Sequence, residues 1–320
     1  MALRQTLAAY EALDNATVDG QAIKRMFQSY EALGVTVEVV TVSNEPPEDP
    51  AHKTDFVIIR IPGTRGKCLG VREPARTLGV IGRNGAIGAR PYRIGMVSDA
   101  DGPVACIAVA LKLAKMKERG DHLAGDVVVT THISTDVSIS ENGGIPFMGM
   151  PVSSATMNRY EVTQEMDAIL SIDASKGNRI VKQRGFALSP TAMQGYILRV
   201  APDLVAIMES TTGAPAVTFP ISLQDITPYD NGLYHFNSIM QPHVATDKPV
   251  VGVAITAMSV VGGSDSSASH EIDLAEAVRF STEVAKRYTA GVCEFHDENE
   301  WRKIRAMYPD LSVFQGYASR

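Results

Sequence analysis

Residues 93–136 constrain the fold of this chain more than any other stretch of its sequence. Residues 94–97 form a short apolar run, which is typical of a buried strand. Over residues 104–116 apolar side chains recur at spacings of three and four, which indicates an amphipathic helix. A second apolar run begins at Val127 and ends at His132. A strand–helix–strand unit of this kind predicts two parallel strands in one sheet.

The rest of the chain repeats this alternation of strands and helices. Apolar, strand-like runs occupy residues 35–42, 55–61, 78–81, 167–173, 178–183, 191–200, 217–223 and 249–257. Helical patterns occupy residues 3–13, 22–33, 202–211, 230–240, 272–288 and 298–308. The alternation predicts an α/β fold with a mixed, mostly parallel sheet. We expect a single domain over residues 1–320, with a small β-rich insertion around residues 62–92 and a long loop over residues 138–157.

Composition and charge exclude several classes of function. The net charge is −6 and no basic stripe is interleaved with aromatic residues, so we expect no nucleic-acid partner. No apolar run approaches the roughly 20 residues that a membrane-spanning helix needs. The N-terminal residues also lack the apolar core of a signal peptide. The three cysteines, Cys68, Cys106 and Cys293, form no CxxC pair, and their odd number favours a reducing compartment. The sequence therefore predicts a cytoplasmic protein.

Polar side chains follow four of the apolar runs, namely Asp101, His132, Asp173 and His270. In parallel sheets ligands bind beyond the carboxyl ends of the strands, so these side chains are candidates for one shared site. Asp and His are also the residue types that hold a catalytic zinc ion or a two-metal centre. Each has a structural alternative. Asp101 and its neighbour Asp99 suit a helix cap, and a single His at a strand end is more often structural.

One stretch of the sequence resembles a known enzyme family. The segment DGPVACIAVALKLAKMKERGDHLAGDVVVTTHIST, which begins at Asp101, resembles the core of the co-catalytic zinc aminopeptidases, especially the tetrahedral glutamyl- or leucyl-aminopeptidase-like group. In that family an Asp-Asn/Asp-x-x-Gly step opens a helix, and its first Asp bridges two metal ions. Asp101 matches that bridging position. Asp173 in DAILSIDAS and His270 in SASHEIDLAEAV match two later metal ligands of the family.

The resemblance covers about residues 55–290 of the chain. It implies a three-layer α/β sandwich, zinc or another divalent transition metal as the cofactor, a peptide or small-molecule substrate, and a homo-oligomer. The chain as a whole also resembles an uncharacterised prokaryotic family that is described only as a domain of unknown function. That second resemblance implies no established activity.

Two elements of the aminopeptidase pattern are missing from the sequence. The family's first ligand lies in a His-x-Asp motif after an early strand, and the comparable segment, DFVIIRIPGTRG, contains no His. The family's Glu-Glu pair, which supplies a general base and a ligand, is replaced by Thr131-His132-Ile133. His132 is therefore a candidate substitute ligand, because neutral imidazole binds zinc well. Asp136 and Glu141, in the loop that follows, are candidates for the base, and their spacing favours neither.

Three further residues are candidates for substrate binding. Arg60 and Arg65 flank a Pro-Gly turn after an early strand, and a guanidinium group matches the geometry of a substrate carboxylate. A solvated turn or an ion pair is the alternative for both. Asp230 opens a predicted helix near the expected site, and a helix cap is its alternative role.

The sequence leaves two main hypotheses of function. The first is a metal-dependent, aminopeptidase-like hydrolase of a peptide or small amide, in which the metal polarises the carbonyl and generates hydroxide. The second is a peptidase-like fold without peptidase activity, which serves as a binding or assembly protein or as an enzyme of another class. A third hypothesis, a serine nucleophile near His270, lacks support from a GxSxG motif.

Overall fold

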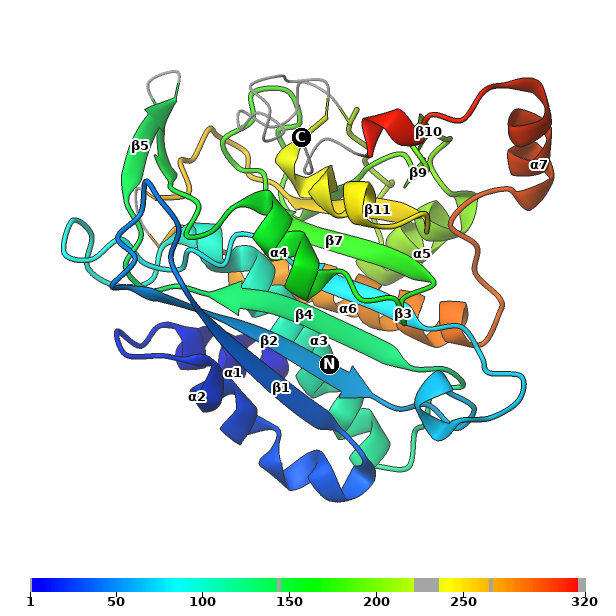
Figure 1. Ribbon diagram of the computed structural model, residues 1–320, viewed down its shortest axis with the longest axis horizontal. Helices are drawn as coiled ribbons and strands as arrows, with labels where there is room; N and C mark the ends of the chain where they lie inside the picture. Colours follow the sequence, from blue (N-terminus) through cyan, green and yellow to red (C-terminus); the bar gives the residue numbers. More distant parts are fainter. Residues whose placement is uncertain (1, 143–144, 222–235, 265–266, 316–320) are drawn as a thin grey trace.

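The computed structural model describes residues 2–142, 145–221, 236–264 and 267–315 of the 320-residue chain. A mixed β-sheet lies at the centre of the molecule, between two layers of helices (Figure 1). The three-layer α/β fold predicted from the sequence is therefore confirmed.

The four central strands are parallel, and antiparallel strands complete the sheet on both sides. The long strands are arranged in the order β1 (Thr36–Ser43), β2 (Lys53–Ile61), β4 (Val127–Ile133), β3 (Leu78–Gly82), β7 (Ala168–Ala174) and β11 (Val250–Ile255). The parallel strands are β4, β3, β7 and β11. Three short strands extend the sheet beyond β11, namely β8 (Phe186–Leu188), β9 (Ala192–Met193) and β10 (Tyr196–Ile197). A separate hairpin consists of β5 (Ile139–Asn142) and β6 (Ile145–Met148). The carboxyl ends of the central strands meet at one edge of the sheet, where ligands bind in folds of this class.

Helices cover both faces of the sheet (Figure 1). The first face carries α1 (Leu3–Leu13), α2 (Gly20–Met26), α3 (Asp101–Glu118), α5 (Pro202–Thr212) and α6 (Glu271–Thr289). The second face carries α4 (Ser154–Glu161) and the 3-10 helix η4 (Ser238–Ala245). Peripheral elements are α7 (Glu298–Met307), η1 (Gln28–Leu33), η2 (Lys67–Leu69), η3 (Ser98–Ala100) and η5 (Ser312–Phe314). No helix in the described part of the chain has the length and apolar character needed to cross a membrane.

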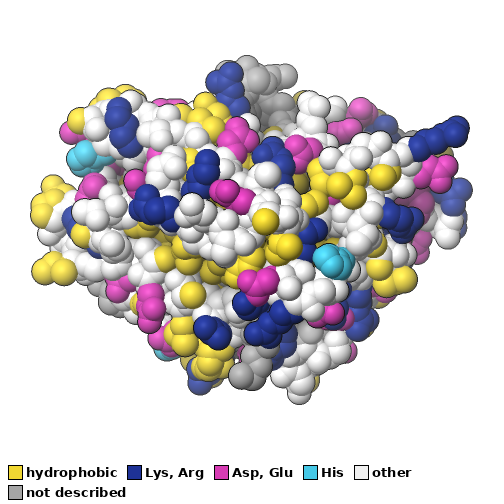
Figure 2. Space-filling view, turned by 90° about the horizontal axis from the view of Figure 1, so that it is seen from below, with side chains coloured by type: hydrophobic (Ala, Val, Ile, Leu, Met, Phe, Trp, Pro, Cys, Tyr) yellow, Lys and Arg dark blue, Asp and Glu magenta, His cyan; other side chains and the backbone are white. Residues whose placement is uncertain are grey.

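The central strands are continuous apolar runs because both of their faces are covered. Every residue of β3, β4 and β11 is buried, and strands buried on both faces lack the alternation of half-exposed strands. Helix α3 is buried from Asp101 to Leu111 between the sheet and the neighbouring helices α1 and α6. Each fully buried Val or Ile contributes about 1.5–3 kcal/mol, so this packing fixes α3 firmly on the sheet. The outer surface differs: Figure 2 shows charged side chains of both signs beside a band of hydrophobic ones.

A glycine brings the first turn of α3 into contact with the carboxyl ends of β3 and β7. A Cβ atom at Gly102 would lie 2.1 Å from the backbone oxygen of Arg83 and 2.9 Å from that of Ile172. Both distances are too short for a side chain, because close-packed carbon and oxygen atoms need more than 3 Å. Only glycine therefore permits this approach, which holds Asp101, the first residue of α3, at the edge where the strands end.

Residues 94–97, predicted as a strand, do not form one. Ile94 is fully exposed, at 100%, and the chain continues directly into η3. The strand that α3 connects to β4 is β3, so the parallel strand–helix–strand unit is confirmed with a different first strand. The sequence pattern of β3 is weak because glycines interrupt it where larger side chains pack. A Cβ at Gly79 would overlap Met166, and one at Gly82 would overlap Cys106.

Other predicted elements differ in extent or type. Residues 178–183 form no strand, and residues 217–221 contribute only an isolated bridge from Thr218 to Leu188. The segment predicted as a loop, residues 138–157, contains the β5–β6 hairpin and the start of α4. Most of the helix predicted at residues 230–240 lies outside the described residues. Short apolar runs do not by themselves distinguish strand from irregular chain, which explains the wrong strand predictions at residues 178–183 and 217–221.

Candidate functional site

A cavity of about 70 Å³ lies at the carboxyl ends of the central strands. Residues that follow β3, the end of β4 and the end of β7 form one side, and the β5–β6 hairpin, α4 and η4 form the others. The polar lining consists of Arg83, Asn84, Asp99, His132, Asp173, Ser238 and Gln241. The apolar lining consists of Ala86, Phe147, Met148, Met150, Pro151 and Met157. The cavity thus joins a polar floor at the strand ends to a wall of thioethers and one aromatic ring.

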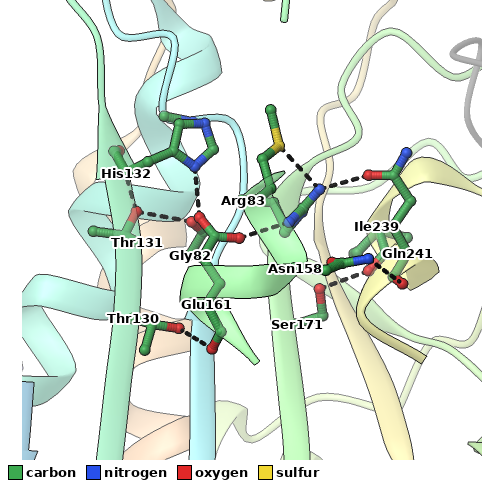
Figure 3. A network of polar contacts seen from close by, with 12 residues as sticks. Gly82, Arg83, Thr130, Thr131, His132, Asn158, Glu161, Ser171, Ile239 and Gln241 are labelled. Atoms are coloured by element: carbon green, nitrogen blue, oxygen red, sulfur yellow. Dashed lines mark hydrogen bonds and ion pairs between the residues drawn. The ribbon is translucent and has the colours of Figure 1, made fainter. Parts of the chain in front are cut away.

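A buried network of Arg83, Glu161 and His132 supports one side of the cavity (Figure 3). One guanidinium nitrogen of Arg83 donates to Glu161 Oε2 at 2.6 Å, and the other donates to Gln241 Oε1 at 2.5 Å. The second carboxylate oxygen of Glu161 lies 2.5 Å from His132 Nδ1. The three charged or titratable side chains are between 0% and 5% exposed. The network therefore balances the charge of Arg83 internally and joins β3 and β4 to α4 and η4.

The contacts of His132 define which ring nitrogen carries the proton. The backbone N–H of Gly85 donates to His132 Nε2 at 3.2 Å, so Nε2 acts as the acceptor. In a neutral imidazole the other nitrogen is then protonated, and Nδ1–H donates to Glu161. Gly85 also packs closely against the ring, since a Cβ there would be 2.3 Å from His132 Cδ2. Both ring nitrogens are thus engaged within the protein.

A second buried ion pair joins Asp101 to Lys176. The Asp101 side chain is 0% exposed and the Lys176 side chain 3%. Lys176 Nζ contacts Asp101 Oδ2 and also donates to the backbone oxygen of Ala268 at 3.0 Å. The hydroxyl of Ser269 donates to the other carboxylate oxygen of Asp101. Three segments meet at this pair: the start of α3, the chain after β7 and the chain before α6.

Two carboxylates give the cavity its acidic character. Asp99 and Asp173 both line it and are only 8% and 3% exposed. Asn84 donates from its side-chain amide to Asp99 Oδ1 at 3.0 Å. The backbone of Asn84 has a φ of +62°, in the left-handed region that Asn tolerates better than most residues. Among the described residues of the lining, Arg83 is the only Lys or Arg, and Glu161 already balances it.

The four predicted metal ligands occupy three different environments. His132 and Asp173 line the cavity, Asp101 is held by Lys176 outside the lining, and His270 is exposed at the N-cap of α6. Within residues 2–142, 145–221, 236–264 and 267–315, no three His, Cys, Asp or Glu side chains are placed to hold a metal ion. Both oxygens of Asp101 and both ring nitrogens of His132 already have partners. These residues therefore do not fit a co-catalytic metal pair in the arrangement described here.

The other predicted site residues lie away from the cavity or outside the described residues. Arg60 pairs with Glu38 and Glu165, and its strand position opposite Val128 places it near the start of β4. Arg65 is exposed in the turn that follows β2. These two arginines thus lie toward the opposite end of the sheet from His132.

Of the two candidate bases and Asp230, the structure describes the side chain of Asp136 alone. Asp136 accepts a hydrogen bond from the Thr135 hydroxyl at 2.8 Å and does not line the cavity. Glu141 belongs to β5, but its side chain lies outside the described part of the structure, as does the whole of Asp230. The base and substrate roles of these residues stay predictions.

Sequence patterns gave little indication of Arg83, Glu161 and Lys176. Arg83 follows β3, whose glycines weaken the sequence pattern of a strand. Glu161 ends a helix that begins in a segment predicted as a loop. Lys176 was detectable in principle, because it lies three residues after Asp173 and beyond the end of a buried strand.

The cysteine nearest the strand ends, Cys106, is fully buried, and burial raises the pKa of its thiol, as expected for a core residue.

Comparison with solved structures shows that this chain has the fold of aminopeptidases. Its structure is similar to that of a leucyl aminopeptidase from Trypanosoma cruzi, with a TM-score of 0.52, 11% identity, and coverage of 86% of this chain and 62% of that one. It is similar to the bottromycin maturation enzyme BotP, with a TM-score of 0.51, 13% identity, and coverage of 88% and 70%. The leucine aminopeptidase of Caenorhabditis elegans gives a TM-score of 0.51, 10% identity, and coverage of 92% and 66%.

At these identities the similarity establishes the fold alone, and the chain spans only 62% of the length of the Trypanosoma cruzi enzyme. Comparison of the sequence with curated proteins finds no match. A family model, in contrast, matches residues 46–318 of the chain. This chain therefore belongs to the family described as "Protein of unknown function (DUF1177)", and it has the fold of leucyl aminopeptidases.

Proposed function

We propose that this protein, which has a peptidase-like fold, binds a small, amine-bearing molecule at the carboxyl ends of its central strands. Examples of such a ligand are the amino-terminal end of a peptide and a small amide. One observation carries this proposal. Two carboxylates, Asp99 and Asp173, line the same cavity and are 8% and 3% exposed. Carboxylate oxygens accept strong, charge-assisted hydrogen bonds from an ammonium group.

The apolar wall supports the same class of ligand. Met148, Met150 and Met157 are flexible thioethers that adapt to irregular aliphatic groups, and Phe147 adds an aromatic ring to the lining. A cation beside an aromatic face gains about 0.5–2 kcal/mol. The cavity volume of about 70 Å³ suits one small head group, with the rest of the ligand directed toward solvent.

The buried contacts favour the second hypothesis from the sequence over the first. The residue that matches the bridging Asp of the zinc aminopeptidases, Asp101, is paired with Lys176. We therefore propose a binding protein, or an enzyme of another class, on an aminopeptidase-like fold. We also propose that the chain forms a homo-oligomer, as the family resemblance implies. The molar mass of the purified protein, measured by light scattering, tests this.

Calorimetric titration with glycinamide tests the proposal, with N-acetylglycinamide as the ligand that lacks an ammonium group. We expect binding of glycinamide alone, weakened at least about tenfold in Asp99→Asn and in Asp173→Asn, since each removes one buried charge partner. Asp136→Asn is the matched control, because Asp136 does not line the cavity. Equal binding of the two ligands, or equal affinity in all three variants, overturns the proposal.

A metal-dependent hydrolase of peptides or small amides is the second candidate. It is favoured by the presence of two carboxylates, Asp99 and Asp173, on the same cavity. Carboxylate oxygens are suitable ligands for zinc and related divalent metals. Equilibrium dialysis against Mn²⁺ and Zn²⁺ tests this candidate. A stoichiometric ion that Asp173→Asn releases, accompanied by release of amino acids from small peptides, would favour it over the first.

A further inference from the structure

We propose that Lys176 is a built-in counter-ion for Asp101, so that an ammonium group takes the place in which the aminopeptidase resemblance puts a bridging metal ion. The proposal concerns the same edge of the sheet as the cavity, but it does not depend on what the cavity binds. It rests on the burial and the contacts of three residues, Asp101, Lys176 and Ser269.

The burial of Asp101 makes a counter-charge obligatory. Its side chain is 0% exposed, and an ionised carboxylate without water or a partner is very costly. A bridging carboxylate would need both of its oxygens for metal ions. Here Oδ2 contacts the ammonium group of Lys176, and Oδ1 accepts from the Ser269 hydroxyl. Each carboxylate oxygen of Asp101 therefore already contacts a polar group of the chain, one through an ion pair and the other through a hydrogen bond.

The environment of Lys176 is equally specific. Its side chain is 3% exposed, and its ammonium group forms the ion pair with Asp101 and donates to the backbone oxygen of Ala268. Its own backbone oxygen accepts from the Val261 N–H at 3.1 Å and from Lys182 Nζ at 3.2 Å. Lys176 thus joins α3 to the two chain segments that follow β7 and β11. A long flexible side chain fixed in this way has lost its rotamer freedom, which indicates a strong positioning contact.

This arrangement has a consequence that distinguishes it from a metal-loaded site. The counter-ion is covalently attached, so the start of α3 stays in place whether or not divalent ions are present. Without the ammonium group, Asp101 needs a cation from solution. A Lys176→Ala variant leaves a space shaped for an alkylammonium ion, whereas Lys176→Met fills that space without a charge.

Thermal unfolding of the full chain, followed by near-ultraviolet circular dichroism, tests the inference. We expect Lys176→Met and Asp101→Asn each to lower Tm by roughly 6–15 °C, because each leaves one buried charge unpaired. The double variant should lose clearly less than the sum of the two. Propylammonium chloride should raise the Tm of Lys176→Ala but not that of Lys176→Met, with sodium chloride as the salt control. Lys248→Met, at an exposed lysine that precedes β11, is the control substitution and should change Tm little.

Two results overturn the inference. One is an additive double variant, with no rescue by propylammonium. The other is a wild-type Tm that rises with Mn²⁺ or Zn²⁺ and falls with chelator, in a manner that Asp101→Asn abolishes. The measurement of Tm with metal and chelator uses only the wild type and Asp101→Asn. It therefore tests the inference even if the Lys176 variants do not fold. If the Asp101–Lys176 inference fails, the expected binding of glycinamide is unaffected. The two proposals can therefore be tested independently.

Discussion

Glu161→Gln is the perturbation that most directly tests the buried network behind the cavity. The substitution keeps the shape of the side chain but removes its charge. In the wild type the carboxylate accepts from Arg83 at 2.6 Å and from His132 at 2.5 Å, and the Glu161 and Arg83 side chains are 0% and 5% exposed. Removing one partner of a buried ion pair costs about 3–5 kcal/mol, because the other charge stays buried without compensation. For a chain of this size the corresponding loss of Tm is roughly 6–15 °C.

A matched control lies toward the opposite end of the sheet. Glu165 pairs with Arg60 at 3.0 Å, but the two side chains are 44% and 31% exposed. Exposed pairs of this kind contribute about 0–1 kcal/mol, so Glu165→Gln should be nearly silent. Urea unfolding followed by circular dichroism compares the two variants directly. The double variant Arg83→Met/Glu161→Leu should recover part of the loss, because it removes both buried charges together.

The reasoning is refuted if Glu161→Gln loses no more stability than Glu165→Gln. That result would mean that water or mobile side chains compensate Arg83 as well as Glu161 does. A large loss in Glu161→Gln with no recovery in the double variant would also count against it, since it would assign the effect to packing and not to charge.

Three further predictions concern a thiol, a glycine and a strained asparagine. Partial desolvation of the thiol of Cys68, an exposed residue, together with the nearby Asp126 carboxylate, raises its pKa to about 11. Its reaction with iodoacetamide at pH 8 should therefore be roughly 100-fold slower than in the urea-unfolded chain, and should accelerate as the pH rises through 11. Asp126→Asn lowers that pKa and should raise the rate, as read by mass spectrometry; equal rates in both variants contradict the assignment. Gly102→Ala should lower the free energy of unfolding by about 1–3 kcal/mol or more, since its Cβ would lie 2.1 Å from a backbone oxygen. Gly213→Ala, where an added Cβ has no atom within 4 Å, should lower it by only about 1 kcal/mol because of the positive φ. Comparable losses in urea would refute the packing argument. Asn84→Gly should leave stability within about 1 kcal/mol, because glycine also accepts a φ of +62°, yet should weaken glycinamide binding by freeing Asp99; unchanged affinity would exclude a positioning role for Asn84.

The fold was predictable because its main signals are long and mutually consistent. The amphipathic pattern of α3 and the apolar run of β4 define a strand–helix–strand unit, and the pattern holds even though its first strand was assigned to the wrong residues. The error at residues 94–97 has a simple physical cause. A short apolar run has no period that distinguishes a strand from an exposed turn, whereas the true strand, β3, carries glycines that neighbouring side chains require.

The candidate site was predictable only where a residue lies directly at the end of a strong strand. His132 and Asp173 meet that condition, and both line the cavity. Arg83 and Glu161 do not, because one follows an unrecognised strand and the other ends a short helix. What a residue contacts is a tertiary property. The pairing of Asp101 with Lys176 joins residues 75 positions apart, since 176 − 101 = 75, and no local pattern encodes it.

Metal content of the purified protein tests the central claim most directly. Wild type, Asp101→Asn and Asp173→Asn are incubated with Zn²⁺, Mn²⁺ or Co²⁺, dialysed and measured by inductively coupled plasma mass spectrometry. An internal ion pair at Asp101 predicts that wild type and Asp101→Asn retain the same amount of metal, well below one equivalent per chain. One or two equivalents in the wild type, lost in a folded Asp101→Asn variant, would contradict the account and establish Asp101 as a metal ligand.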